Sequence, residues 1–191
     1  MNKLFLILLL IFFFQSLTKA DDIRDFEIEG MSIGDSALEF FDKKEIEERK
    51  KIGFVYTDKT FFAATFYNKD FFEKYHNVQL HIKANDSKYI IYSVAGKINY
   101  EDNYNECVNE MEKILPELKV LFPEARFFDD GTAIWTNDKG YKVKTKSYYL
   151  LLSDGANIAL ECYDQPKEMN IIDGLSIAID SNEFVEFLTT D

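Results

Sequence analysis

The stretch from Asn103 to Phe122 constrains the fold more than any other part of the chain. Its apolar residues recur at steps of three and four: Tyr104, Cys107, Met111, Leu115, Leu118 and Phe122. This spacing predicts an amphipathic helix whose buried stripe packs on another layer of structure. Pro116 lies inside the stretch and has no backbone N–H, so we expect a kink there or two helices that meet at Leu115.

The segments on either side alternate between apolar and polar residues. A period of two predicts strands with one buried and one wet face. We expect six such strands, around Phe62–Phe66, Val78–Ile82, Ile90–Tyr100, Val143–Leu152, Ile158–Cys162 and Leu175–Ile179. Runs of strands without alternating helices predict an α+β domain. In this domain an antiparallel sheet of about six strands carries the long helix, and short helices lie near the ends of the chain.

The first 20 residues have the three parts of a secretory signal peptide. Lys3 is basic, Leu4 to Phe14 is an apolar run, and Thr18-Lys19-Ala20 offers small residues at a cleavage site. The apolar run is shorter than the ~20 residues that a spanning helix needs. We therefore expect cleavage after Ala20, export to the periplasm or the extracellular space, and no stable membrane insertion. Residues 21–191 form a single domain. The alternatives are an uncleaved anchor and a buried helix.

Acidic residues dominate the composition. The chain has 34 Asp and Glu against 22 Lys and Arg, a net charge of −12. Loss of residues 1–20 removes Lys3 and Lys19, which leaves 20 basic residues and a net charge of −14. Such a polyanion is repelled by nucleic acid and by anionic lipid, so we expect no nucleic-acid partner. We interpret the charge mainly as solubilising.

The two cysteines, Cys107 and Cys162, both point inward by their own patterns. Cys107 lies in the apolar stripe of the predicted helix, and Cys162 shares a strand face with Ile158 and Leu160. In an exported chain, two cysteines favour one disulfide. Closing this loop would stabilise the fold by about 4 kcal/mol through the chain entropy. The alternative is a pair of buried free thiols.

Residue patterns that accompany catalysis are scarce. The two histidines, His76 and His81, are five residues apart, which does not suit a metal pair on one strand face, and we interpret them as surface residues. The chain has no Gly-x-Ser-x-Gly elbow and no glycine-rich phosphate loop. Acidic pairs such as Asp129-Asp130 carry little information among 34 acids. We therefore predict no metal, no cofactor and no identifiable catalytic residue.

An aromatic segment is the first candidate for a binding surface. Phe127 and Phe128 lead into a predicted loop, Asp129 to Gly140, which carries the only tryptophan, Trp135, and is followed by Tyr141. An aromatic side chain on a polar loop can stack on a sugar ring or anchor a partner. The alternative is that Trp135 folds back onto the core.

A row of lysines is the second candidate. Lys142, Lys144 and Lys146 share one face of one predicted strand, and a local basic row in an acidic protein could receive an anionic ligand. The stronger alternative is that lysines on an edge strand prevent aggregation. The uncharged run Phe61 to Tyr67, which has a high β-propensity, makes such protection useful.

Several short motifs occur in the order Ile23–Phe26, Ile28–Ser36, Leu38, Asn105–Cys107, Glu161–Asp164 and Glu183–Phe184. In these motifs the chain resembles a group of small exported bacterial proteins of unknown function. The resemblance implies export and a place in the bacterial cell envelope, and it implies no activity. Gly30 to Phe41 is also similar to the helix entry of small outer-membrane assembly lipoproteins, although no cysteine precedes Cys107 to carry a lipid.

These observations favour a non-enzymatic exported binding module whose ligand is an unidentified protein or small molecule. The second hypothesis is an assembly or structural factor of the cell envelope, and the third is an extracytoplasmic hydrolase that uses acidic loop residues. A carboxylate with a raised pKa in an apolar cleft would favour the hydrolase. A large exposed apolar patch would favour the assembly factor. The oligomeric state is not determined by the sequence.

Overall fold

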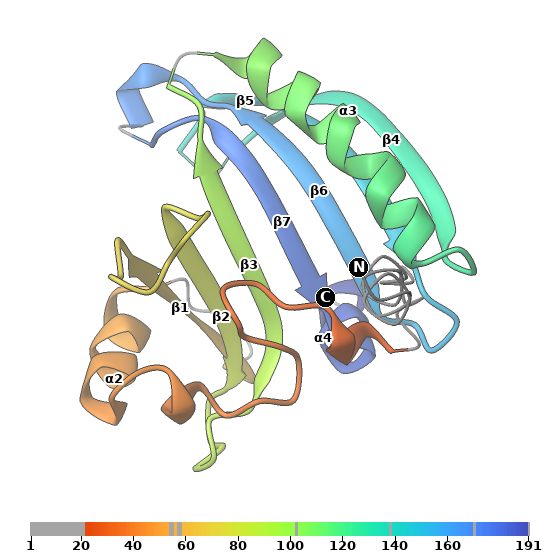
Figure 1. Ribbon diagram of the computed structural model, residues 1–191. Coiled ribbons are helices and arrows are strands. Elements are labelled where there is room, and N and C mark those ends of the chain that lie inside the picture. Colours follow the sequence, from red (N-terminus) through yellow and green to blue (C-terminus); the bar gives the residue numbers. More distant parts are fainter. Residues whose placement is uncertain are drawn as a thin grey trace, which may run out of the picture.

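The computed structural model describes residues 22–53, 56, 59–101, 103–137, 139–169 and 171–190, so the predicted signal peptide lies outside it. Within these residues the strands form one antiparallel sheet, in the order β1-β2-β3-β7-β6-β5-β4 (Figure 1). The strands are β1 (Phe61–Tyr67), β2 (Asn77–Lys83), β3 (Ile91–Asn99), β4 (Arg126–Thr136), β5 (Lys142–Leu151), β6 (Asn157–Asp164) and β7 (Gly174–Asp180). The α-helices are α2 (Lys43–Ile52), α3 (Tyr104–Leu121) and α4 (Asn182–Thr189), and the 3-10 turns are η1 (Ile23–Asp25), η2 (Ala37–Glu39) and η3 (Lys167–Met169). The α+β class is confirmed.

The sheet contains one strand more than predicted. The segment expected to be a loop, Asp129 to Gly140, is mostly part of β4, which is the last strand of the sheet. Most side chains of β4 are exposed on both faces, so its sequence lacks the alternation that burial imposes. A register shift between Asp129 and Gly131, where Gly131 has a φ of +72°, interrupts the pairing with β5.

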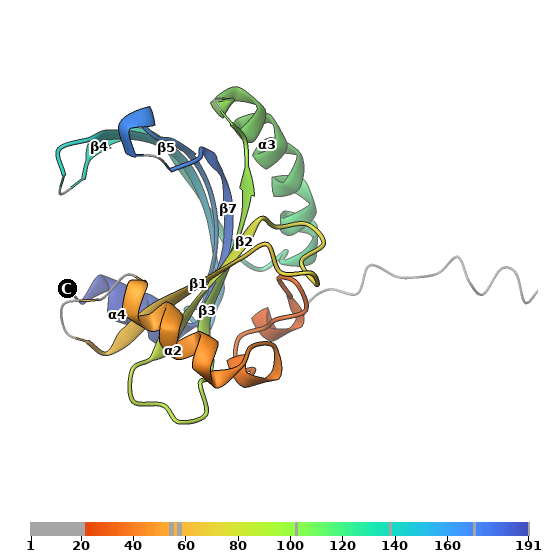
Figure 2. The same ribbon diagram turned by 90° about the vertical axis from the view of Figure 1, so that its left-hand side faces the viewer.

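The sheet is strongly bent and has a convex and a concave face (Figure 2). Helix α3 and the N-terminal segment with η1 and η2 lie on the convex face, whereas α4 lies on the concave face. In β2, β3, β6 and β7 the residues that point to the convex face are mostly apolar and buried, for example Leu80, Val94, Ile177 and Leu160. The hydrophobic core therefore lies between the convex face and its helical cover.

Helix α3 presents the predicted stripe to this core. Cys107, Met111, Leu115 and Leu118 are all buried. The helix continues through Pro116 as one element, so it is not divided into two helices at that point. In the described part of the chain, no helix has the length and apolar character that crossing a membrane requires.

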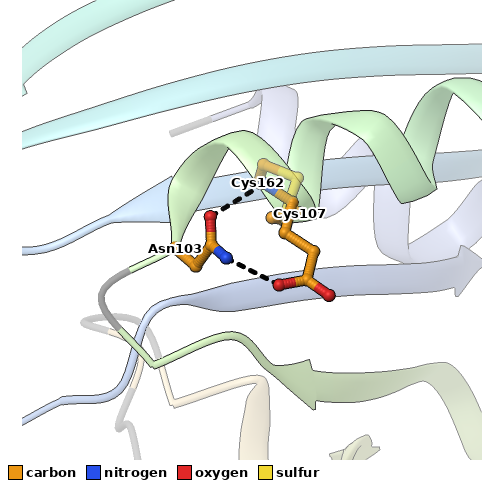
Figure 3. The surroundings of a disulfide bond; sticks show 4 residues. Asn103, Cys107 and Cys162 are labelled. Atoms are coloured by element: carbon orange, nitrogen blue, oxygen red, sulfur yellow. Dashed lines mark hydrogen bonds between the residues drawn. A yellow bond between two sulfur atoms is a disulfide. The ribbon is translucent and has the colours of Figure 1, made fainter.

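The predicted disulfide is confirmed. Cys107 on α3 and Cys162 on β6 are joined by an S–S bond of 2.02 Å, with their Cα atoms 5.9 Å apart (Figure 3). One turn before Cys107, Asn103 caps the helix: its Oδ1 accepts from the Glu106 N–H at 3.2 Å, and its Nδ2 donates to Glu106 Oε2 at 2.6 Å. A disulfide of this kind indicates an oxidising compartment.

Helix α2 covers the outer edge of β1. The Lys50 ammonium lies 4.6 Å from the centre of the Phe62 ring, and the Arg49 guanidinium lies 5.9 Å from that of Tyr67. At the end of the helix, a Cβ atom added to Gly53 would lie only 1.9 Å from the carbonyl oxygen of Ala63. Glycine at position 53 therefore lets the end of α2 approach the backbone of β1, whose own sequence is uncharged.

Candidate functional site

The concave face is built from the strand residues that alternate with the core residues. Because directly paired residues of antiparallel strands lie on the same face, the register aligns these side chains in rows across β2, β3, β7 and β6. The central row contains Gln79, Ala95, Ala178 and Ala159. One neighbouring row contains Asn77, Lys97, Ser176 and Glu161, and the other contains His81, Ser93, Asp180 and Asn157. Three small alanines thus form a floor between two polar rows.

Two adjoining hollows lie on the Asn77 and Lys97 side of this face, and the smaller one reaches Ala95 of the central row; their volumes are about 210 and 420 Å³. They share the side chains of Asn77, Gln79 and Lys97. The smaller hollow is completed by Ala95, Tyr163, Gln165 and Ser176, and the larger one by Thr65, Tyr67, Asn68, His76, Asn99, Ile171 and Ile172. Among the described residues, no aspartate or glutamate lines either hollow, although the chain has 34 of them.

Lys97 is the cation of this site. In the described part of the chain its ammonium donates one hydrogen bond, to the Ile172 carbonyl oxygen at 2.6 Å. Burial lowers the pKa of Lys97, although the nearby Asp173 carboxylate works in the opposite direction. An ammonium has three donors, so Lys97 retains donors for a ligand in the hollow. A half-buried cation of this kind is most stable when an anion lies beside it.

Amide side chains supply several of the other polar groups that line the two hollows. Gln79 donates from Nε2 to Thr65 Oγ1 at 2.9 Å, which fixes the orientation of its amide on β2. The Gln165 backbone N–H donates to Asp173 Oδ1 at 2.7 Å, which holds the chain at the end of β6 beside the smaller hollow. Amides both donate and accept hydrogen bonds, so these groups suit hydroxyl, amide and carboxylate partners.

Glu161 organises the wall beside the smaller hollow. Its Oε1 accepts from Tyr149 OH at 3.0 Å and from Ser147 Oγ at 3.2 Å, and its other oxygen accepts from Tyr163 OH. Burial, followed by the charge of Glu161, raises the pKa of Tyr149 to about 12. Both tyrosines therefore remain protonated donors at neutral pH. The network fixes Tyr163, which lines the hollow.

A second polar cluster lies on the concave face beneath α4. His81 Nδ1 is 3.0 Å from Ser93 Oγ, Ser93 also hydrogen-bonds Asp180, and Asn157 Nδ2 lies 3.5 Å from Asp180 Oδ2. The ring of Phe184 on α4 stacks on His81 with the centroids 4.5 Å apart. The prediction that His81 is a surface residue is therefore wrong, because α4 covers the outward face of β2 at this point.

Burial also sets the protonation states in this cluster. It lowers the pKa of His81 to about 4 and raises the pKa of Asp180 to about 6. A row of His, Ser and Asp has the residue types of a hydrolase triad. However, Ser93 is only 1% exposed, and none of the three residues lines a hollow of the described structure. The cluster is a satisfied polar layer under α4 rather than a site open to substrate.

The predicted aromatic residues lie at the border of the concave face. Phe128 pairs with Tyr149, and Trp135 pairs with Val143, so both point to the concave side of β4. They are 40% and 45% exposed, so Trp135 is not folded into the core. Tyr141 is half-buried next to the β4–β5 turn, where its N–H donates to Asn137 Oδ1 at 3.0 Å.

The predicted lysine row lies on the opposite face. Lys142, Lys144 and Lys146 pair with Thr136, Ile134 and Thr132 on the convex side. The Lys144 ammonium lies 3.9 Å from the centre of the Tyr104 ring, and that of Lys146 lies 3.5 Å from Glu112 Oε1. Their interpretation as edge protection is wrong, because β5 pairs with a strand on each side and β4 forms the edge. The structure thus separates the lysines from the aromatic residues.

The residues of the concave hollows were missed in the sequence because outward polar positions of a strand are usually solvated. One signal was available. The outward positions of β3, β6 and β7 include Ala95, Ala159 and Ala178, although long charged residues would be expected on a wet sheet face.

Among the described residues, no group of three or more His, Cys, Asp or Glu side chains is arranged to hold a metal ion. The two hollows therefore offer hydrogen bonds and one half-buried cation, beside a wall in which a carboxylate fixes two tyrosines. Comparison with known proteins adds nothing to this chemistry: no family model, curated protein or solved structure significantly matches the chain.

Proposed function

We propose that this protein is a non-enzymatic binding module of the periplasm or extracellular space. Its ligand is a small polar molecule that carries a carboxylate or a similar anionic group, held in the concave hollows. One observation carries the proposal. Lys97 is a half-buried cation that lines both hollows, and no carboxylate among the described residues lines either of them.

The chemistry of the site matches such a ligand. An anionic group beside Lys97 would compensate the burial of the ammonium and bring its pKa back towards the ordinary value. The amides of Asn77, Gln79 and Gln165 would hydrogen-bond the uncharged polar part of the ligand. The combined volume suits a molecule of the size of a monosaccharide or an amino acid derivative.

Two observations support the location outside the cytoplasm. The first 20 residues have the pattern of a signal peptide, and the domain is closed by the disulfide between Cys107 and Cys162. Binding is preferred to hydrolysis because the carboxyl group with the clearly raised pKa, Asp180, is covered by α4 and does not line a hollow of the described structure.

The test compares charged probes with neutral ones. Galacturonate, an N-acetylated amino acid and a small hydroxy acid are each titrated beside the corresponding neutral sugar or amide, and binding is followed by NMR chemical shifts. We expect at least one carboxylate to bind about tenfold more tightly than its neutral counterpart, which corresponds to about 1.4 kcal/mol.

Two matched variants locate the binding. Lys97→Met should abolish the preference for the carboxylate, because it removes the cation and keeps the length of the side chain. Lys88→Met, at an exposed residue between β2 and β3, should leave it unchanged. If the carboxylates bind no better than the neutral probes, or if binding survives in Lys97→Met, the proposal fails.

A second candidate function is an assembly or structural factor of the cell envelope. The observation that favours it is a different one: the outer edge of β4 is exposed and carries large apolar side chains, among them Ile134 at 68% exposure.

A further inference from the structure

The two edges of the sheet differ in what lies next to them. Strand β1 is uncharged, but α2 packs along it, and five of its seven residues are buried. Strand β4 has 11 residues and forms the opposite edge. Within the described residues no strand pairs with its outer side. Its outward backbone N–H and C=O groups are therefore available to another strand.

The features that usually protect an edge lie in the first half of β4. Arg126, Asp129 and Asp130 are charged, and the register shift falls between Asp129 and Gly131. The second half, Thr132 to Thr136, has no charge, no proline and no register shift. It carries two exposed apolar side chains, Ile134 at 68% and Trp135 at 45%. Such a segment is suited to accept an extended strand.

The two sides of this half-strand differ in chemistry. On the convex side, Thr132, Ile134 and Thr136 pair with Lys146, Lys144 and Lys142, so a row of lysines lies one strand inward from the edge. On the concave side, Ala133 and Trp135 pair with Thr145 and Val143. A strand added at the edge would therefore have a basic row near its convex side chains and an aromatic, uncharged surface near its concave side chains.

We infer that the β4 edge from Thr132 to Thr136 binds an extended segment of a partner protein by strand addition. The bound segment alternates acidic residues, which face the lysine row, with apolar residues, which pack beside Trp135. Backbone hydrogen bonds supply the affinity, and the alternating side chains select the sequence and the register. This surface is distinct from the concave hollows.

The charge distribution argues against a second copy as the occupant. Two β4 edges paired antiparallel about a two-fold axis perpendicular to the sheet would continue the sheet with the same face up. The three lysines of each copy would then lie on one face, at the sides of the new junction, without acidic strand residues to offset them. An acidic segment instead complements the row.

The test uses the sole tryptophan as its reporter, because Trp135 lies on the proposed surface. Three eight-residue peptides are titrated while its fluorescence is recorded. The first alternates Glu with Val or Thr, the second has Lys in place of Glu, and the third is the Glu peptide with every second backbone nitrogen methylated. We expect the Glu peptide to bind about tenfold more tightly than the Lys peptide, and the methylated peptide to lose binding.

Matched variants then locate the contact. Ile134→Glu places a negative charge beside the lysine row. This charge repels the glutamates of the peptide and should weaken its binding about tenfold. Val120→Glu changes a residue of α3 that is 57% exposed and should leave binding unchanged. Lys97→Met should also leave it unchanged, which separates this inference from the proposed function. Thermal unfolding of each variant checks that the fold is intact.

Three results would overturn the inference. Absence of binding of the Glu peptide at millimolar concentration excludes the predicted recognition. Equal binding of the methylated peptide shows attraction by charge alone, without strand addition. A dimer in sedimentation equilibrium that Ile134→Glu disrupts shows that a second copy occupies the edge.

Discussion

The two faces of the sheet are made by the same strands and yet have opposite chemistry. On β6, Leu160 and Cys162 point to the convex face and are fully buried, whereas Glu161 and Tyr163 point to the concave face and hydrogen-bond each other. The convex face is covered by α3 and the N-terminal segment and is cross-linked to α3. Within one layer, the parity of the strand residues thus separates apolar packing on one face from a polar hydrogen-bonding surface on the other.

The difference follows from what covers each face. A face packed under helices gains free energy with every apolar side chain it buries. On the concave face, α4 covers the cluster around His81 and the neighbouring ring of Phe61, and the other polar groups find partners on the sheet itself. Four predictions test this division, beginning with the largest effect.

Removal of the disulfide should have the largest effect on the convex side. We expect Cys107→Ala combined with Cys162→Ala to lower the free energy of unfolding by about 4 kcal/mol, because the unfolded chain regains the entropy of a long loop. Urea denaturation measures the change, and reduction of the wild-type disulfide is the control. A loss below about 1 kcal/mol would show that the cross-link adds little to the packing of α3.

Adjacent residues of β6 should differ in cost because they point to opposite faces. Leu160→Ala should destabilise the protein by about 3 to 4 kcal/mol, since it leaves a cavity under α3. Glu161→Gln should cost about 1 kcal/mol, because the amide oxygen still accepts from the tyrosines. Denaturation measures both losses in the free energy of unfolding. Equal losses would show that the convex and concave faces do not differ in their contribution to stability.

The buried Asp180 should make the concave side sensitive to pH. Burial raises its pKa from 3.8 to about 6, so the folded protein binds this proton more tightly than the unfolded chain. As the pH rises from about 4 to 6, the wild type should lose up to about 3 kcal/mol of stability relative to Asp180→Asn, which cannot titrate there. Above pH 6 the difference should stay constant.

Thermal or urea unfolding of both proteins between pH 4 and pH 8 gives this difference directly, since other groups titrate alike in the two. A difference that does not change with pH would mean that the pKa of Asp180 is the same in the folded protein as in the unfolded chain.

The smallest effect is expected for the lysines of the convex side. Lys146 lies 3.5 Å from Glu112 Oε1, and the two side chains are 20% and 47% exposed. A pair of this exposure contributes below about 1 kcal/mol, so Lys146→Gln should change stability only slightly and less in high salt. Lys142→Gln on the same strand is the control. A larger loss of stability in Lys146→Gln would show that the contact of Lys146 with α3 contributes substantially to the fold.

Much of the architecture was predictable, because buried apolar residues recur in the sequence with the period of the helix or strand that carries them. The apolar stripe of α3 and the inward parity of Cys162 are enough to predict the cross-link and the layers. Strand β4 was missed because an edge exposed on both sides has no such period. His81 was wrongly predicted to be a surface residue for a related reason. Its alternation with core residues places it on the outward face of β2, but α4 covers that face.

The candidate site could not be predicted, because it depends on pairing between strands that are distant in the sequence. Lys97 on β3 and Ser176 on β7 become neighbours only through the strand order, and Gln165 joins them from the end of β6. Nothing in the individual segments indicates this register, since each strand shows only its own alternation.

The layers, the long helix and the disulfide can be predicted from the sequence, because each depends on the spacing of apolar residues within one segment. The strand order, in contrast, sets which outward residues meet in the concave hollows and which sheet edge α2 leaves exposed. The physical reason is that local patterns record whether a side chain is buried. They do not record which other side chains lie beside it.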